Sequence, residues 1–226
     1  MKKIIITALL TSLIAGAAFA DSNVVSSANV VGYVQLEVPS NTFSLIAMQF
    51  ITTNDAGVTI DEAFGTSMPD GTELYIFDGT YTAYSYIDGM GWLDEGAVDA
   101  GSVLIKRGQS LWIKNPEGTP LDVTLSGNVP LAATITTNSL AEGFTLISSC
   151  YPVSESLADL DLSPLDGDQI YVYAAGSYTT YSYIDGMGWL DEGAVDASNV
   201  IIDVGVGFWY KTSAARDWIQ PRPYTL

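Results

Sequence analysis

The 226-residue sequence contains no histidine and only one cysteine. Without an imidazole, the Ser-His-Asp and Cys-His arrangements of nucleophilic catalysis are excluded, as are most zinc, copper and non-haem iron sites. No Ser-x-x-Lys spacing and no phosphate-binding glycine loop takes their place. A single cysteine cannot form a disulfide within the chain, so packing must stabilise the fold. Cys150 ends an apolar run that starts at Phe144, which favours a buried thiol over a bridge between two chains.

Basic residues are also scarce, because eight Lys and Arg stand against 26 Asp and Glu, giving a net charge of −18. Such a field repels phosphate groups, which excludes nucleic acid and anionic lipid as partners. Two interpretations of the acidity stay open. It keeps an exported protein in solution, or it attracts divalent cations and basic partners.

Long hydrophobic runs are missing outside the first twenty residues. There, a pair of lysines precedes an apolar stretch, and an A-x-A cleavage site ends at Ala20, before Asp21. This pattern predicts a secretory signal peptide over residues 1–20 and a short N-terminal extension over 21–28. Because the apolar stretch is too short for a permanent anchor, we expect no integral membrane segment. The expected location is secreted, at the cell surface or outside the cell, with the periplasm as an alternative.

The sequence does contain an internal repeat. Residues 84–100 and 181–197 are the same seventeen letters, YSYIDGMGWLDEGAVDA, at an offset of 97. Looser matches continue on both sides: GQSLWIK follows the first copy, and GVGFWYK follows the second. Repetition of one unit predicts two tandem modules, over residues 29–130 and 131–226.

Each module consists of short apolar runs separated by Gly, Asp, Asn and Pro, a pattern typical of β-strands with tight turns. With 48% apolar residues, the chain can build a substantial core. We therefore expect an all-β fold of two tandem β-sandwich-like modules related by internal duplication. Asp78-Gly79 predicts a hairpin with a type I′ turn. The strands expected in the first module are residues 30–38, 43–50, 73–78, 81–87, 103–106, 109–114 and 121–126.

One short helix is expected in each module. Thr59 and Glu62 have the spacing of a capping box, ahead of a brief stretch that ends at Phe64. The corresponding segment of the second module runs from Glu155 to Leu160, and we expect the same helix there.

Three strand-like motifs carry a resemblance to a known kind of module. They are FTLI at 144–147, the run GDQIYVY that ends at Tyr173, and GVGFWYK at 205–211. With them the chain resembles a β-repeat unit found in exported bacterial surface proteins, in which an F-x-L-I strand opens the unit and a G-x-G-F/Y-W-I/V-K strand closes it. The first copy departs from this pattern at Ser110 and Leu111, where Gly and Phe would be usual. The resemblance implies an extracellular module without catalytic residues.

Two interpretations of the duplicated segment stay open: a recent duplication or gene conversion, or two loops that present the same contact. Its carboxylates are dense, and calcium is a hard cation that takes 6–8 oxygen ligands. The spacing does not match an EF-hand. Calcium is the one cofactor that the sequence suggests, and its candidate ligands are Asp88, Asp94, Glu95 and Asp99 with Asp185, Asp191, Glu192 and Asp196.

The same segment carries aromatic residues on expected strands and, by our prediction, at loop tips. Exposed rings stack on sugar rings, while Asp and Glu bind the hydroxyls, which suggests a glycan site. The alternative is that these rings belong to the core or to a ladder between strands, the commoner position of tyrosine in sheets. The candidates are Tyr84 and Tyr86 with Tyr181 and Tyr183 on the strands, and Trp92 and Trp189 at the tips.

These observations favour a secreted, non-catalytic structural or adhesive protein over an enzyme. Its expected partners are other surface proteins or further copies of itself, through strand edges and the β-rich run from Ser22 to Val38. A carbohydrate-binding module, assisted by calcium, is the alternative. A glycosidase comes third, because the adjacent Asp94-Glu95 and Asp191-Glu192 pairs point to opposite faces of a strand and are not pre-arranged as acid and base.

Overall fold

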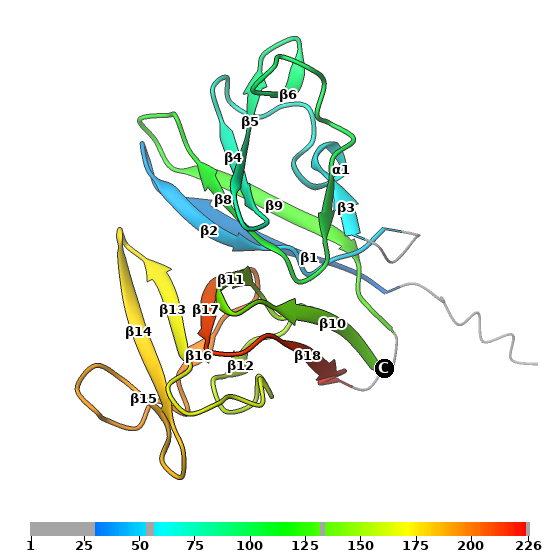
Figure 1. Ribbon diagram of the computed structural model, residues 1–226. Helices are drawn as coiled ribbons and strands as arrows, with labels where there is room; N and C mark the ends of the chain where they lie inside the picture. Colours follow the sequence, from blue (N-terminus) through cyan, green and yellow to red (C-terminus); the bar gives the residue numbers. More distant parts are fainter. Residues whose placement is uncertain (1–29, 53–56, 132–133, 225–226) are drawn as a thin grey trace, which may run out of the picture.

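The structure, a computed structural model, describes residues 30–52, 57–131 and 134–224 (Figure 1). The fold is all-β, as the short apolar runs predict. No helix in this described part is long and apolar enough to cross a membrane. The first module contains β1 (Val31–Val38), β2 (Phe43–Ala47), β3 (Gly57–Thr59), α1 (Ile60–Phe64), β4 (Glu73–Phe77), β5 (Tyr81–Ile87), β6 (Gly91–Asp94), β7 (Leu104–Lys106), β8 (Ser110–Lys114) and β9 (Leu121–Asn128). The second contains β10 (Thr134–Leu140), β11 (Gly143–Ile147), β12 (Glu155–Ser156), β13 (Gln169–Ala174), β14 (Ser177–Ile184), β15 (Gly188–Leu190), β16 (Ile201–Ile202), β17 (Phe208–Thr212) and β18 (Arg216–Pro221).

The two modules have the same strand pairing, which confirms two β-sandwich-like units related by duplication. In the first, a five-stranded antiparallel sheet has the order β2-β8-β4-β5-β6, with the two-stranded ribbons β1-β9 and β3-β7. In the second, the order is β11-β17-β13-β14-β15, with the ribbons β10-β18 and β12-β16. Each strand of the first module therefore has a counterpart nine strands later in the chain with equivalent partners.

One face of each five-stranded sheet packs on a core of its own. Along β4, buried Leu74 and Ile76 alternate with half-buried neighbours, which is the period of two expected for a strand. Trp92 belongs to the core of the first module, and Trp189 belongs to that of the second. Cys150 is fully buried, as its apolar surroundings in the sequence predict.

The hairpin predicted at Asp78-Gly79 forms, but its turn is not of type I′. That turn needs a positive φ at both central residues, and of these two only Gly79 has one, at 81°. Phe77 pairs with Tyr81, so three residues make the connection. The second module has one more residue here and makes the two-residue turn instead, with positive φ at both Ala175 (50°) and Gly176 (85°).

The helix predicted in the first module is confirmed as α1, and its counterpart at 155–160 is wrong. The Thr59 hydroxyl accepts a hydrogen bond from the Glu62 N–H (3.2 Å), and the Glu62 carboxylate accepts one from the Thr59 N–H (2.8 Å). In the second module a single turn follows β12. There the shorter Asp159 side chain accepts from the Ser156 hydroxyl (2.6 Å) and does not close a capping box on the Ser156 amide.

Two equivalent β-bridges are among the contacts that join the modules, as an approximate two-fold axis requires. Ile46, near the end of β2, forms an antiparallel bridge with Val206 of the second module. Its counterpart Ile147, at the end of β11, forms the equivalent bridge with Gln109 of the first module. The same backbone hydrogen bond accompanies each bridge, from the next residue along the chain to a glycine carbonyl: Ala47 to Gly205 at 2.8 Å and Ser148 to Gly108 at 2.9 Å. The first bridge has a second, longer one, from the Gly207 N–H to the Leu45 carbonyl at 3.5 Å.

Ser110 and Gly207 hold equivalent positions in the two modules and meet between these bridges. A Cβ on Gly207 would lie 2.4 Å from the Ser110 Oγ and 3.2 Å from the Ile46 carbonyl oxygen. Only one of the two positions can therefore carry a side chain. The serine that departs from the repeat motif in the first module is the residue that fills this space.

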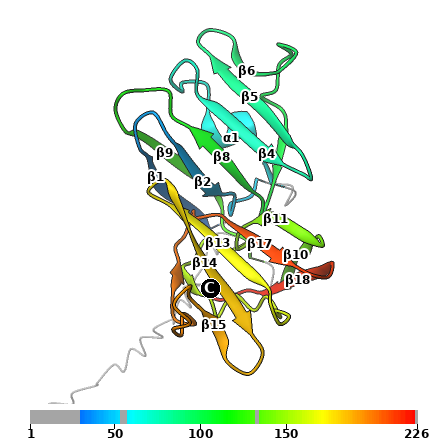
Figure 2. The ribbon, with the colours of Figure 1, turned by 60° about the vertical axis from the view of Figure 1, so that its left-hand side comes forward.

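The duplicated segments lie at opposite ends of the molecule. The β5–β6 hairpin is at the top of Figure 1, and the β14–β15 hairpin is near its lower end. The view turned by 60° places them in the same way (Figure 2). The two identical segments therefore face different surroundings and do not contribute to one common site.

Candidate functional site

The aromatic residues of the duplicated segment lie in the cores and not at loop tips. Trp92 in β6 is fully buried, and Trp189 in β15 is 3% exposed. The hairpin is so tight that the strand resumes at Gly91, and its alternation turns Trp92 inward, against the Tyr86 ring at 5.4 Å. The exposed glycan platform predicted at these tips is therefore wrong, and the core interpretation is confirmed. The remaining candidates, Tyr84, Tyr181 and Tyr183, are partly buried and pack against the same two cores.

The acidic residues of the segment cap turns of its own backbone. Asp94 Oδ1 accepts hydrogen bonds from the N–H groups of Gly96 (2.8 Å) and Val98 (2.9 Å), and Asp191 makes the same two contacts in the second module. Within the described ranges, no group of three His, Cys, Asp or Glu side chains could hold a metal ion. The structure therefore does not gather the predicted calcium ligands into such a group. Asp99 and Asp196 each accept from a backbone N–H two residues on, and Asp88, Glu95, Asp185 and Glu192 are exposed.

A different set of aromatic residues covers the outer faces of the two five-stranded sheets. These residues sit at the strand positions that alternate with the core, such as Trp112 between buried Leu111 and Ile113 in β8. We call them the aromatic belt. Its members are Phe43, Tyr75, Phe77, Tyr81 and Trp112 in the first module and, at the equivalent positions, Phe144, Tyr171, Tyr173, Tyr178 and Trp209 in the second.

Neighbouring rings of the belt touch within each module and across the junction. Ring centroids lie 5.1–6.5 Å apart in the first half and 5.2–6.4 Å apart in the second. Three contacts cross the junction. Two of them are equivalent, Phe77 with Trp209 at 4.8 Å and Tyr173 with Trp112 at 4.7 Å, and the third joins Trp112 to Tyr178 at 6.4 Å. The ten rings therefore form one continuous surface that neither module has alone.

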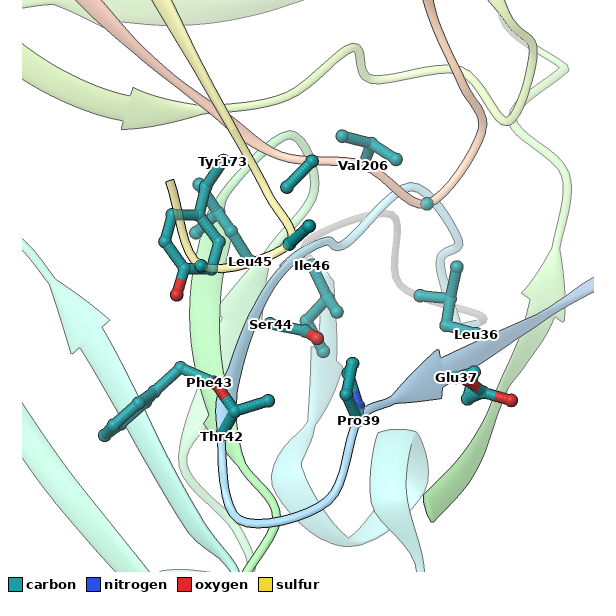
Figure 3. A pocket seen from close by; sticks show the side chains of 14 residues that line it. Leu36, Glu37, Pro39, Thr42, Phe43, Ser44, Leu45, Ile46, Tyr173 and Val206 are labelled. Atoms are coloured by element: carbon teal, nitrogen blue, oxygen red, sulfur yellow. The ribbon is translucent and has the colours of Figure 1, made fainter. Parts of the chain in front are cut away.

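Rings of the belt surround one hollow and reach the edge of a neighbouring groove. An apolar hollow of about 490 Å³ is lined by Phe43, Tyr75, Tyr81, Trp112 and Tyr173. A groove of about 540 Å³ runs on from it between β2 and the β13–β14 turn, and Figure 3 shows Phe43 and Tyr173 in its lining. These two residues line both spaces, so the groove adjoins the hollow at Phe43 and Tyr173.

Polar side chains border the belt at equivalent places in both modules. The Lys114 ammonium lies 3.1 Å from the Glu73 carboxylate and 6.0 Å from the centre of the Phe43 ring. In the second module Lys211 donates to the Gln169 amide oxygen (3.2 Å) and lies 5.6 Å from the centre of the Phe144 ring. At these equivalent places the two modules therefore carry two lysines, one carboxylate and one amide.

Titration of the rim follows from these contacts. Burial disfavours the charged form of Glu73, but hydrogen bonds from Tyr75 and Lys114 and the lysine charge outweigh it, so the pKa of Glu73 lies below its usual value. The hydrogen bond to Glu73, together with burial, raises the pKa of Tyr75 to about 12. At neutral pH the rim therefore presents an ionised Glu73 carboxylate beside a protonated Tyr75 hydroxyl.

The sequence reasoning did not identify the belt residues as candidates, although the sequence carries a signal for them. Its rings include these aromatic residues of the motifs that carry the resemblance: the Phe of F-x-L-I, the Tyr residues of IYVY and the Trp of GFWYK.

Comparison of the chain with models of protein families, with curated proteins and with solved structures returned no match. The resemblance to exported surface modules therefore stays a prediction.

Proposed function

We propose that this chain is a secreted, non-catalytic adhesive protein of the cell exterior that holds a neutral polysaccharide on its aromatic belt. The observation that carries the proposal is the continuity of the ten rings over the junction between the modules. Aromatic faces bury the apolar C–H faces of sugar rings, and a small number of polar groups then fix the hydroxyls. The belt supplies both, with Lys114, Glu73, Gln169 and Lys211 at its rim.

The shape of the site supports an extended ligand. The hollow and the groove share Phe43 and Tyr173, so a chain of several sugar units can lie along both. Two equivalent halves of the belt also suit a polymer, because its repeating units present the same contacts more than once. A small ligand would use only part of this surface.

The charge of the chain supports a neutral ligand. After removal of the predicted signal peptide, six basic residues stand against 26 acidic ones, a net charge of −20. Polyanions are repelled by this field, although the belt itself carries Lys114 and Lys211. The absence of histidine and the aromatic character of the belt support a holding function over bond cleavage.

Affinity electrophoresis tests the proposal with four soluble probes: hydroxyethylcellulose, xylan, glucomannan and the polyanion alginate. We expect at least one of the three neutral polymers, and not alginate, to retard the protein. Because burial of one ring on a ligand contributes about 1.4 kcal/mol, Tyr81→Ala and Tyr178→Ala should each weaken binding about tenfold. Both side chains are nearly half exposed, so their removal should leave the fold intact.

Tyr33→Ala is the matched control, because Tyr33 is an exposed tyrosine outside the belt. Its binding should equal that of the wild type. The proposal fails if none of the neutral polymers retards the wild type, or if the two belt variants bind as tightly as the control does.

A further inference from the structure

The ribbon of β1 and β9 has one edge without a backbone partner. Val30 accepts a hydrogen bond from the Val129 N–H (2.7 Å), which identifies 30/129 as a hydrogen-bonded pair of the antiparallel ladder. Such pairs recur at every second residue, so the backbone groups of Val31, Tyr33, Gln35 and Glu37 point away from β9. No other strand of the described ranges pairs with β1.

The opposite edge of the ribbon is partly closed. Asn128 of β9 exchanges two backbone hydrogen bonds with Ile51, at 2.9 and 3.1 Å. Next to it, β9 presents the polar side chains of Asp122, Thr124 and Ser126 to solvent. The β9 edge is therefore paired at Asn128, whereas the β1 edge has no strand partner in the described ranges.

The outer face of β1 is unusually apolar for an exposed edge. Tyr33 is 76% exposed and Val31 is 71% exposed, more than any other large hydrophobic side chain of the described residues. Natural edge strands are protected by lysine, proline or bulges, and β1 has none of these along its eight residues. Its only charged residue is Glu37, in a chain with 26 acidic residues.

We propose that β1 pairs with β1 of a second copy of this chain, in an antiparallel arrangement about a two-fold axis. The result is a four-stranded sheet with β9 of each copy on the outside. Pairing of Tyr33 with Gln35 of the other copy uses the free backbone groups of both strands. It also places each Glu37 opposite a Val31, whereas parallel pairing in register would bring the two carboxylates side by side.

This pairing goes beyond the proposed glycan binding, and its surface meets the proposed glycan site only at Leu36 and Glu37, where β1 borders the groove. None of the ten belt rings lies on β1. A dimer would carry two belts and so hold a polymer at two places, which increases avidity without any new contact to sugar.

Sedimentation equilibrium of the chain from Asp21 onward, the form predicted after export, tests the pairing. We expect the mass to rise with concentration towards that of a dimer. Gln35→Pro should remove this rise, because proline lacks the outward N–H and obstructs an incoming strand. The bonds between β1 and β9 use the residues on either side and stay intact, so the variant should fold.

Two controls separate the edge from other causes. Gln35→Ala keeps the backbone N–H, so it should associate like the wild type. Thr124→Pro makes the same substitution at the residue paired with Gln35 on β9, where the N–H faces the other edge, and it should also leave the dimer intact.

The proposal is overturned if the wild type stays monomeric at every concentration, or if Gln35→Pro dimerises as well as Gln35→Ala does. It is also overturned by a dimer that survives Gln35→Pro but disappears when residues 21–29 are deleted, since the N-terminal extension would then form the interface. Retardation of Gln35→Pro by the neutral polysaccharides is read separately. A wild type that binds polysaccharide but stays monomeric would sink this inference and leave the glycan proposal standing. A wild type that dimerises but binds none of the polymers would do the opposite, and Gln35→Pro is expected to bind polysaccharide as a monomer.

Discussion

The two modules share every strand pairing and yet differ in the chemistry of their cores. Thr72 and Asp168 hold equivalent positions, since the carbonyl of each accepts the N–H of an equivalent tyrosine at 2.8 Å. Ile113 of the first core likewise corresponds to Tyr210 of the second, and both are fully buried. A cluster without charge in one module is thus replaced by a polar network in the other.

The network of the second module consists of Asp168, Tyr210 and Arg216. The Asp168 side chain is 1% exposed, forms an ion pair with Arg216, and accepts hydrogen bonds from the Tyr210 hydroxyl (2.5 Å) and the Leu165 N–H (2.8 Å). Burial raises the pKa of Asp168, but these hydrogen bonds outweigh it and hold the pKa below the usual value. In the first module, Leu121 starts β9 where Arg216 starts β18.

The comparison teaches that the residues of a buried polar network are replaced together, because each of them depends on the others. A buried carboxylate without its partners is strongly unfavourable, whereas a complete network and an apolar cluster of similar volume are nearly equivalent. The belt behaves differently, because most of its rings are the same residue type in both modules although they lie on the outer face. Folding alone requires the interior to be filled, so the retained rings point to a use of the surface.

We expect the largest loss of stability from a substitution that breaks the polar network of the second module. Arg216→Leu leaves the Asp168 carboxylate buried without its ion-pair partner, and we expect a loss of about 3–5 kcal/mol in the free energy of unfolding. The triple variant Asp168→Thr, Tyr210→Ile, Arg216→Leu copies the first module and should regain most of this loss. Urea denaturation measures both. A triple variant no more stable than the single one would contradict the interpretation.

A smaller loss of stability is expected at the junction between the modules, when the second module is given the serine of the first. Gly207→Ser places two serines in the space that holds one, and overpacking of this kind costs about 1–3 kcal/mol. The double variant Ser110→Gly, Gly207→Ser moves the single side chain across the approximate axis and should restore most of the stability. Thermal and urea unfolding of the single and double variants test this. Equal stabilities of the two variants would count against the paired arrangement.

We expect the smallest effect on stability from a fall in pH, because it adds a proton to the network and removes no atom. The folded pKa of Asp168 lies below its unfolded value of about 3.9, so its contribution is complete above that value and is lost as the pH falls through the folded pKa. The wild type should therefore lose stability below about pH 4 more steeply than the triple variant. The free energy of unfolding of both proteins between about pH 2 and about pH 6 decides this. Parallel curves would show that Asp168 makes no such contribution.

Local features were predictable because short-range physics produces them. The capping box of Thr59 and Glu62 involves residues three apart, so its geometry follows from their identities alone. The same reasoning failed for the segment 155–160, because aspartate in place of glutamate shortens the side chain by one methylene group and the cap does not close. The position of the hairpin at Gly79 was predictable. Its turn type was not, because it depends on which residues form the last pair of the ladder, here Phe77 and Tyr81.

The candidate site was not predictable because both faces of its strands are aromatic. In β5, Tyr81 points to the belt, whereas Tyr84 and Tyr86 point to the core, and alternation by itself does not say which face is covered. The sequence reasoning left two interpretations of these tyrosines and tryptophans open, an exposed glycan site and the core. It missed the exposed rings, which come together only when β2, β4, β5 and β8 pair and the two modules meet.

The sequence by itself determined the duplication, the all-β class and the two cores. The repeat and the period of two are patterns in the order of the residues, and they do not depend on which segments meet in the fold. Only the tertiary structure decided which aromatic face is open, that Ser110 and Gly207 share one space, and that β1 keeps a free edge. These outcomes depend on contacts between segments about one hundred residues apart, and the geometry of such contacts is set by the packing of whole sheets.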